Sequence, residues 1–124
     1  MPHYVWIALG SAIGGMARYW MGTEIVKYYG ASFPWATLVI NVLGSFAIGV
    51  AVNWAEVSLV RYLLIVGICG GFTTFSSFSL ESVALLRQGA WQKGLAYILA
   101  SVTLCVAATF LGSMAGRAVP ARPA

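Results

Sequence analysis

Hydrogen-bonding side chains recur every four residues within two apolar stretches of this chain. The first stretch contains the series Thr37, Asn41 and Ser45. The second contains the longer series Tyr97, Ser101, Cys105, Thr109 and Ser113. Residues four apart lie on the same face of an α-helix, so each series would form a polar stripe. Two interpretations stay open, because hydroxyl groups in such a stripe can bond to carbonyls one turn back or can line a solvated path.

Asn41 carries the most demanding side chain of these stripes. An amide buried in apolar surroundings is costly unless it has a hydrogen-bond partner. Asn41 should therefore face protein or water and not lipid. It can bond to a neighbouring helix, or it can donate to whatever passes along a polar path.

A third apolar stretch is interrupted near its middle by the run Gly70-Gly71-Phe72-Thr73-Thr74. Glycine and threonine are poor helix formers, so this run predicts a break in the helix. Irregular backbone at membrane depth is tolerated only where protein buries it or where it lines a cavity. Carbonyls freed at such a break can coordinate a cation, and freed N–H groups can bind an anion. Phe75 and Phe78 follow the break and share a helix face; they either pack against neighbours or border the polar groups.

Few other side chains could do chemistry. Arg18 and Glu81 are ionisable residues near the ends of apolar stretches, where they are either functional or extend toward the membrane surface. Cys69 and Cys105 lie within apolar stretches and are expected to behave as small buried hydrophobes, with no disulfide or metal site. We find no catalytic triad, carboxylate pair or phosphate-binding loop, so we expect no enzyme activity and no organic cofactor.

The composition indicates which elements must position these residues. Charged residues make up 8% of this chain, whereas soluble domains contain roughly 25%. The apolar stretches cover about 4–21, 34–54, 59–86 and 94–114, and each is long enough for a membrane-spanning helix, which needs ~20 residues. We therefore predict one all-α transmembrane domain over 1–124, with four transmembrane helices in a lipid bilayer. The basic residues form no block that could follow a phosphate backbone, so nucleic acid is not an expected partner.

The loop charges do not select one orientation in the membrane. With four spans, one side carries Arg61, Arg117 and Arg122, and the other carries Lys27, Arg87 and Lys93, with Arg18 added if it extends outward. The excess of basic residues that normally marks the cytoplasmic side is therefore missing. Either other features orient the chain, or it inserts both ways and pairs as an antiparallel dimer. Small residues four apart, such as Gly10 and Gly14, allow close helix packing within or between chains.

Three motifs together resemble the Fluc (CrcB) family of fluoride channels, over nearly the entire chain. These motifs are Gly14-Gly15-x-x-Arg18-Tyr19, Pro34-x-x-Thr37-Leu38-x-x-Asn41-x-x-Gly44 and Gly70-Gly71-Phe72-Thr73-Thr74-Phe75-Ser76-Ser77-Phe78-Ser79. The resemblance implies an antiparallel, dual-topology homodimer in the inner or plasma membrane. Its two pores would pass fluoride passively out of the cell and give fluoride resistance.

The same resemblance implies roles for individual residues. The pore or its polar track would be lined by Asn41, Phe75, Phe78, Thr37, Tyr97, Ser101 and Cys105. Backbone carbonyls of Gly70 and Thr73 would hold a structural sodium ion at the dimer interface. Arg18 would lie in a vestibule and attract anions, and Glu81 would lie beside the track. Cys105 stands where the family leads us to expect serine, and a thiol is the weaker hydrogen-bond donor.

Two other functions compete with the channel. A small proton-coupled multidrug exporter can also have four helices and dual topology, but it needs a carboxylate embedded in the membrane. The first apolar stretch has no Asp or Glu, and Glu81 is near the end of its own stretch. A scaffold subunit that transports nothing would have no need for the two polar stripes.

Overall fold

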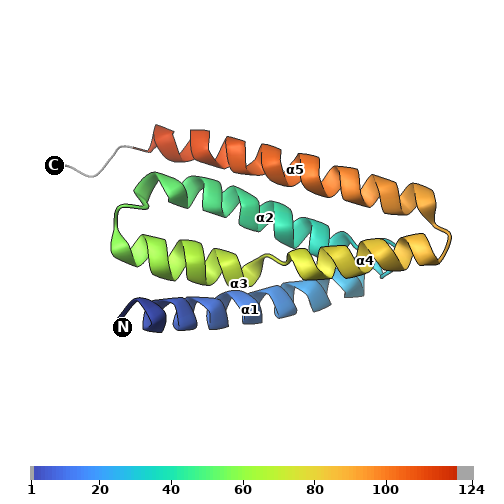
Figure 1. Ribbon diagram of the computed structural model, residues 1–124, viewed down its shortest axis with the longest axis horizontal. Coiled ribbons are helices and arrows are strands. Elements are labelled where there is room, and N and C mark those ends of the chain that lie inside the picture. Colours follow the sequence, from blue (N-terminus) through green and yellow to red (C-terminus); the bar gives the residue numbers. More distant parts are fainter. Residues whose placement is uncertain (1, 120–124) are drawn as a thin grey trace.

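The computed structural model describes residues 2–119, which form antiparallel helical rods packed side by side (Figure 1). Helix α1 covers Pro2–Tyr29 and α2 covers Trp35–Ala51, which a short 3₁₀ turn, η1, extends through Val52–Trp54. The third rod consists of a π-helical segment η2 (Val60–Cys69), the short α3 (Gly70–Phe72) and α4 (Phe75–Arg87). Helix α5 (Trp91–Ala118) completes the bundle. The prediction of an all-α chain is confirmed, and the described residues contain no strand.

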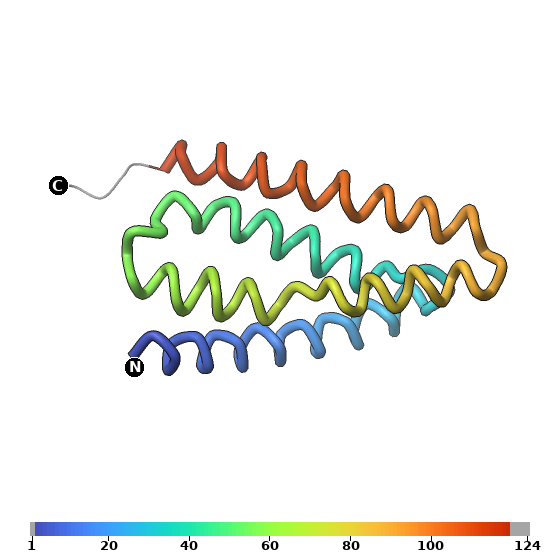
Figure 2. The backbone as a smooth tube through the Cα atoms, in the orientation of Figure 1, coloured from blue at the N-terminus to red at the C-terminus, as the bar shows by residue number. Residues whose placement is uncertain are grey.

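The predicted break in the third rod is confirmed. Thr73 and Thr74 are extended, with φ/ψ of −83°/156° and −148°/110°, between the end of α3 and the start of α4. The tube in Figure 2 straightens at this point before the coil resumes. Thr74 then caps α4, because its hydroxyl oxygen accepts the backbone N–H of Ser77 at 3.1 Å. Such a cap satisfies one of the donors that a helix N-terminus leaves free.

Two glycines end helices at the opposite end of the bundle from the termini. Gly30 after α1 and Gly89 after α4 have φ of 76° and 81°. This left-handed conformation is strained for residues with a Cβ and common after the last helical turn. The chain reverses at both points, and both described ends of the chain lie at the other end of the bundle (Figure 2).

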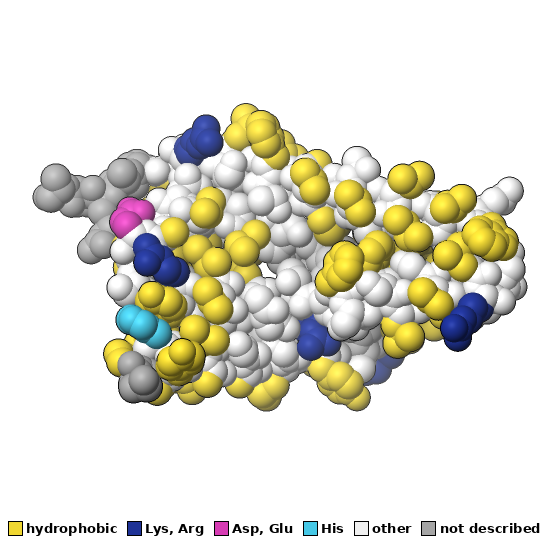
Figure 3. Space-filling view, viewed as in Figure 1, with side chains coloured by type: hydrophobic (Ala, Val, Ile, Leu, Met, Phe, Trp, Pro, Cys, Tyr) yellow, Lys and Arg dark blue, Asp and Glu magenta, His cyan; other side chains and the backbone are white. Residues whose placement is uncertain are grey.

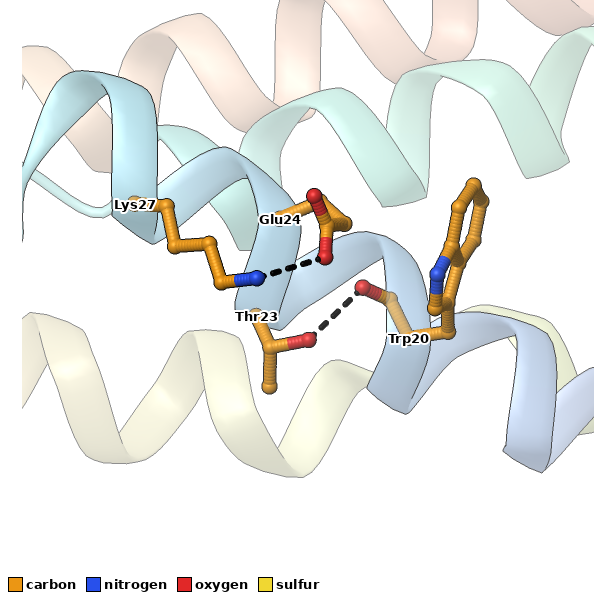
Figure 4. A network of polar contacts seen from close by, with 4 residues as sticks. All are labelled: Trp20, Thr23, Glu24 and Lys27. Carbon is orange, nitrogen blue, oxygen red and sulfur yellow. Dashed lines mark hydrogen bonds and ion pairs between the residues drawn. The ribbon is translucent and has the colours of Figure 1, made fainter.

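Helix α1 is longer than the sequence analysis predicted. The stretch was expected to end near Met21 and a loop to cover 22–33, but the helix continues to Tyr29. Its last turns carry their own polar contacts (Figure 4): Thr23 donates to the carbonyl of Trp20 at 2.8 Å, and Lys27 pairs with Glu24 at 3.0 Å. Polar residues here extend the helix because they bond along it, so the change in polarity did not mark its end. Helix α5 likewise extends beyond the predicted 94–114 at both ends.

Three segments are long and apolar enough to span a membrane: Trp35–Trp54, Val60–Arg87 and Trp91–Ala118. Helix α1, although it has 28 residues, is not among them. Three spans are therefore shown by length and composition. The fourth, α1, stays a prediction. Exposed hydrophobic side chains are spread along the face seen in Figure 3, as expected of a protein that meets lipid.

Glycines allow the helices to approach closely within this chain. A Cβ added to Gly10 would lie 2.8 Å from the Cα of Gly67, and one at Gly14 would lie 2.8 Å from the backbone nitrogen of Phe72. On the other side of the bundle, Gly49 faces the backbone of α5 and Gly112 faces that of α2. The small-residue pairs thus pack α1 on the third rod and α2 on α5.

Candidate ion pathway

A pocket of about 430 Å³ opens at the helix break. We call it the break pocket. Its walls come from α2, the end of η2, the start of α3, the break itself, α4 and α5. Seven residues to which the family resemblance assigns a role line it: Asn41, Gly70, Thr73, Phe75, Phe78, Ser101 and Cys105. Residues from α2, from the third rod on both sides of the break, and from α5 therefore meet around one space.

Asn41 is bonded to the break at both ends of its amide. Its Nδ2 donates to the carbonyl of Thr74 at 3.1 Å, and its Oδ1 accepts the backbone N–H of Thr74 at 2.8 Å. The interhelical interpretation of Asn41 is therefore confirmed. Since an amide nitrogen has two N–H groups, one donor is left over beside the break pocket.

The break also leaves backbone carbonyls without their usual helical donors. In a continuous helix the N–H of Thr74 would donate to Gly70 and that of Ser77 to Thr73. Here the Thr74 N–H donates to Asn41 and the Ser77 N–H donates to the hydroxyl of Thr74. The carbonyls of Gly70 and Thr73 are thus free of these two bonds, at residues that line the break pocket.

The two phenylalanines after the break differ greatly in exposure. Phe75 is 77% exposed on this single chain, whereas Phe78 is 8% exposed. Their ring centroids are 5.4 Å apart, and Phe78 also contacts Tyr97, with centroids 5.3 Å apart. Aromatic ring edges carry partial positive charge, so rings beside the pocket can attract an anion with their edges.

Ser101 has the most unusual hydroxyl of the α5 stripe. The residue is 6% exposed, and its Oγ is buried with no hydrogen-bond partner among the described residues. Buried hydroxyls normally have a partner. The next stripe residue, Cys105, lines both the break pocket and a second space of about 450 Å³, which we call the stripe pocket.

At the far end of the stripe, only Ser113 bonds to a carbonyl one turn back in its own helix, whereas Thr109 bonds across to α2. Thr109 donates to the carbonyl of Ser45 at 3.0 Å, and Ser113 donates to that of Phe110 at 2.9 Å. Both residues line the stripe pocket, together with Ser45 and Cys105. Their hydroxyl hydrogens are committed to backbone carbonyls, while their oxygens can still accept.

Glu81 joins the two remaining track residues away from the break pocket. One carboxylate oxygen accepts from Thr37 at 3.0 Å and the other from the Tyr97 hydroxyl at 3.0 Å. Tyr97 is fully buried. The structure therefore groups Thr37, Tyr97 and Glu81 as one hydrogen-bonded cluster, one helical turn beyond Phe78, and does not place Thr37 or Tyr97 on the wall of the break pocket.

Arg18 is hydrogen-bonded to the backbone beside the break, from the opposite side of the third rod. Its Nε donates to the carbonyl of Gly71 at 3.2 Å. The residue lines a separate space of about 500 Å³ with Thr37, Lys27, Thr74 and Ser77 among its neighbours. Sequence analysis missed this tie and the central role of Thr74. Threonine is a preferred residue at a helix N-cap, so Thr74 carried some local signal. Nothing local pairs Arg18 with a carbonyl 53 positions away.

The sequence of this chain is similar to sequences of known proteins. The family described as "CrcB-like protein, Camphor Resistance (CrcB)" matches residues 5–113. The protein named "Fluoride-specific ion channel FluC" from Paramagnetospirillum magneticum is 48% identical over 122 residues, covering 93% of this chain and 95% of that protein. Proteins of the same name from Magnetococcus marinus and Methylocella silvestris are each 43% identical, covering 92% and 94% of this chain and 97% and 94% of their own lengths. These relatives are named as channels and not as enzymes.

Proposed function

This chain belongs to the CrcB-like family, and from that premise we propose that it is a fluoride-selective channel through which fluoride leaves the cell passively, down its gradient. The names of the relatives support fluoride as the ion. The observation that carries the proposal for this chain is the break pocket, where an unpartnered buried hydroxyl and two phenylalanines meet an interrupted helix.

The wall of the break pocket suits a small anion that has lost its water. Ser101 and Cys105 supply O–H and S–H donors, Asn41 retains one N–H, and the rings of Phe75 and Phe78 supply their edges. Selectivity in channels depends on pore width and on placed donors, and conduction requires that the ion also be able to leave. The described residues that line this pocket include no charged side chain, so an anion would not be trapped there.

The functional unit we propose is an antiparallel homodimer with two pores, in the inner or plasma membrane. Each chain would span the membrane four times, α1 included, since 28 residues reach about 42 Å at the ~1.5 Å rise of an α-helix. The exposure of Phe75 beside an open pocket supports a second copy, because a large ring next to a polar path is better covered by protein than by lipid.

We propose that the carbonyls of Gly70 and Thr73 hold a structural sodium ion. Unwound backbone carbonyls at a helix break are typical sodium ligands in membrane proteins. Both carbonyls have lost the donors that a continuous helix would give them. We propose that both subunits contribute these oxygens, and that sodium would hold the two broken helices together.

Efflux from liposomes tests the channel. Purified protein is reconstituted into vesicles loaded with potassium fluoride, and valinomycin is added so that potassium can follow. We expect rapid fluoride release at a fluoride electrode, and no comparable chloride release from matched potassium chloride vesicles. Equal release of both anions would refute selectivity. Uptake of a cationic dye driven by a proton gradient would instead indicate the exporter.

A further inference from the structure

Cys105 occupies a junction between two spaces. It lies one helical turn after Ser101 on α5, is half-buried, and lines both the break pocket and the stripe pocket. A particle moving from one space to the other along α5 would pass its side chain. A thiol reacts only where reagents can reach it, and partly exposed cysteines are the reactive ones.

The hydroxyl of Ser101 is independent evidence that a ligand binds next to Cys105. It is buried without a partner, although it lies on the wall of the break pocket. Leaving such a group unsatisfied costs free energy of the order of 1–3 kcal/mol. The unpartnered hydroxyl is explained if a ligand accepts a hydrogen bond from Ser101 as it moves past Cys105.

Cys69 supplies a comparison within the same pocket. It sits at the end of η2, also on the wall of the break pocket, but only 7% of it is exposed. It does not line the stripe pocket. The two cysteines therefore share one environment and differ in access.

We propose that Cys105 is a modification site at which small neutral sulfur electrophiles close the ion pathway. The inference rests on the proposed channel function. The Cys105 thiol loses its proton to the buffer, and the thiolate sulfur attacks the sulfenyl sulfur of methyl methanethiosulfonate. A new S–S bond forms on Cys105 as the reagent's S–S bond breaks and methanesulfinate leaves. The product has an apolar methylthio group where the pathway had a donor.

The test uses reconstituted protein treated with methyl methanethiosulfonate. Intact-mass and peptide mass spectrometry measure how much of each cysteine is modified, and fluoride efflux is measured on the same sample. We expect Cys105 to react well before Cys69, and fluoride efflux to fall about tenfold, which is a barrier increase of about 1.4 kcal/mol. Dithiothreitol, which reduces the mixed disulfide, should restore the efflux.

Variants assign the effect to one sulfur. Cys69→Ser should remain sensitive to the reagent, relative to its own untreated rate. Cys105→Ser should be insensitive, with Cys105→Ala as a second variant should the first fold poorly. Unmodified Cys105, full modification without loss of flux, or a block that persists in both Cys105 variants would each overturn the inference. Absence of fluoride efflux from untreated protein would instead refute the channel, while mass spectrometry would still report on the modification site.

Discussion

Both ends of the Asn41 amide bond to the backbone of Thr74, at the point where the third rod is interrupted. The residue therefore has two effects that a single measurement would confuse. It holds the extended backbone at Thr74, whose N–H makes no helical bond, and it leaves one donor beside the break pocket. Asn53 offers a comparison, since its Nδ2 contacts carbonyls on α2 and α5, including Val50 at 3.0 Å and Ser113 at 3.2 Å.

Asn41→Asp should impair flux far more than Asn53→Asp. In both variants a carboxylate replaces an amide donor and faces carbonyl oxygens, which should destabilise each by about 1–3 kcal/mol. Only Asn41 lines the break pocket, where the added negative charge also repels an anion. Thermal unfolding measures the first effect, and efflux per folded protein measures the second. Equal flux in both variants would show that Asn41 does not line the ion pathway.

Two buried serines allow the unpartnered hydroxyl to be tested. Ser82 donates to the carbonyl of Phe78 at 2.7 Å, whereas Ser101 has no partner among the described residues. Ser82→Ala should therefore lower stability by about 1 kcal/mol and leave flux near that of the parent. Ser101→Ala should keep or raise stability but slow flux, since it removes a donor that the fold itself does not use. The reverse pattern would show that Ser101 has an unseen structural partner.

At the scale of elements, the sequence was most informative where backbone chemistry is local. The run Gly70-Gly71-Phe72-Thr73-Thr74 predicts a break, and the break lies at the two threonines, a residue type that does not favour a helix, while both glycines stay helical in α3. The end of α1 was predicted wrongly because polarity was taken to mark it. Glu24 and Lys27 support further helical turns, and the helix ends only where Gly30 permits a left-handed conformation.

Long-range contacts between elements could not be predicted from the sequence. Thr37, Tyr97 and Glu81 were predicted as neighbours of one track, yet they form a separate hydrogen-bonded cluster, with Tyr97 fully buried. Their grouping depends on how α2, α4 and α5 rotate against one another, and helical spacing within one element does not determine that rotation. The tie from Arg18 on α1 to Gly71 on α3 has the same origin.

Two variants of Arg18 separate the effect of its hydrogen bond to Gly71 from the effect of its positive charge on anions. Arg18→Lys keeps the charge but loses the planar guanidinium that donates to Gly71. Arg18→Gln loses both. We expect both to lower the thermal midpoint. Flux through the parent and Arg18→Lys should fall as salt rises, because salt screens attraction of anions, while flux through Arg18→Gln should depend less on salt. Unchanged stability in both variants would show that the tie contributes nothing.

At the scale of the whole molecule, the bundle carries similar charge at its two ends. Arg61, at the start of η2, and Arg117, near the end of α5, belong to the end that holds the termini. Lys27, near the end of α1, Arg87, at the end of α4, and Lys93, near the start of α5, belong to the end with Gly30 and Gly89. Arg122, which the sequence analysis also counted, is outside the described residues. Two basic residues against three give no decisive excess, so membrane insertion should have little preference between the two directions.

Labelling from one side of the membrane tests this expectation. In a background without Cys69 and Cys105, a cysteine is placed at exposed Gln88, near the turn between α4 and α5, or at Glu56, at the opposite end of the bundle. With both orientations present, a reagent that cannot cross the membrane should label about half of each variant in intact cells, and the remainder only after permeabilisation.

Adding two arginines directly after Val119 should then move both labelled fractions away from one half, in opposite directions, because basic residues favour the cytoplasmic side. Should Gln88→Cys be fully labelled and Glu56→Cys fully protected before any charge is added, the chain has one orientation, and two copies in the same membrane could not pair antiparallel.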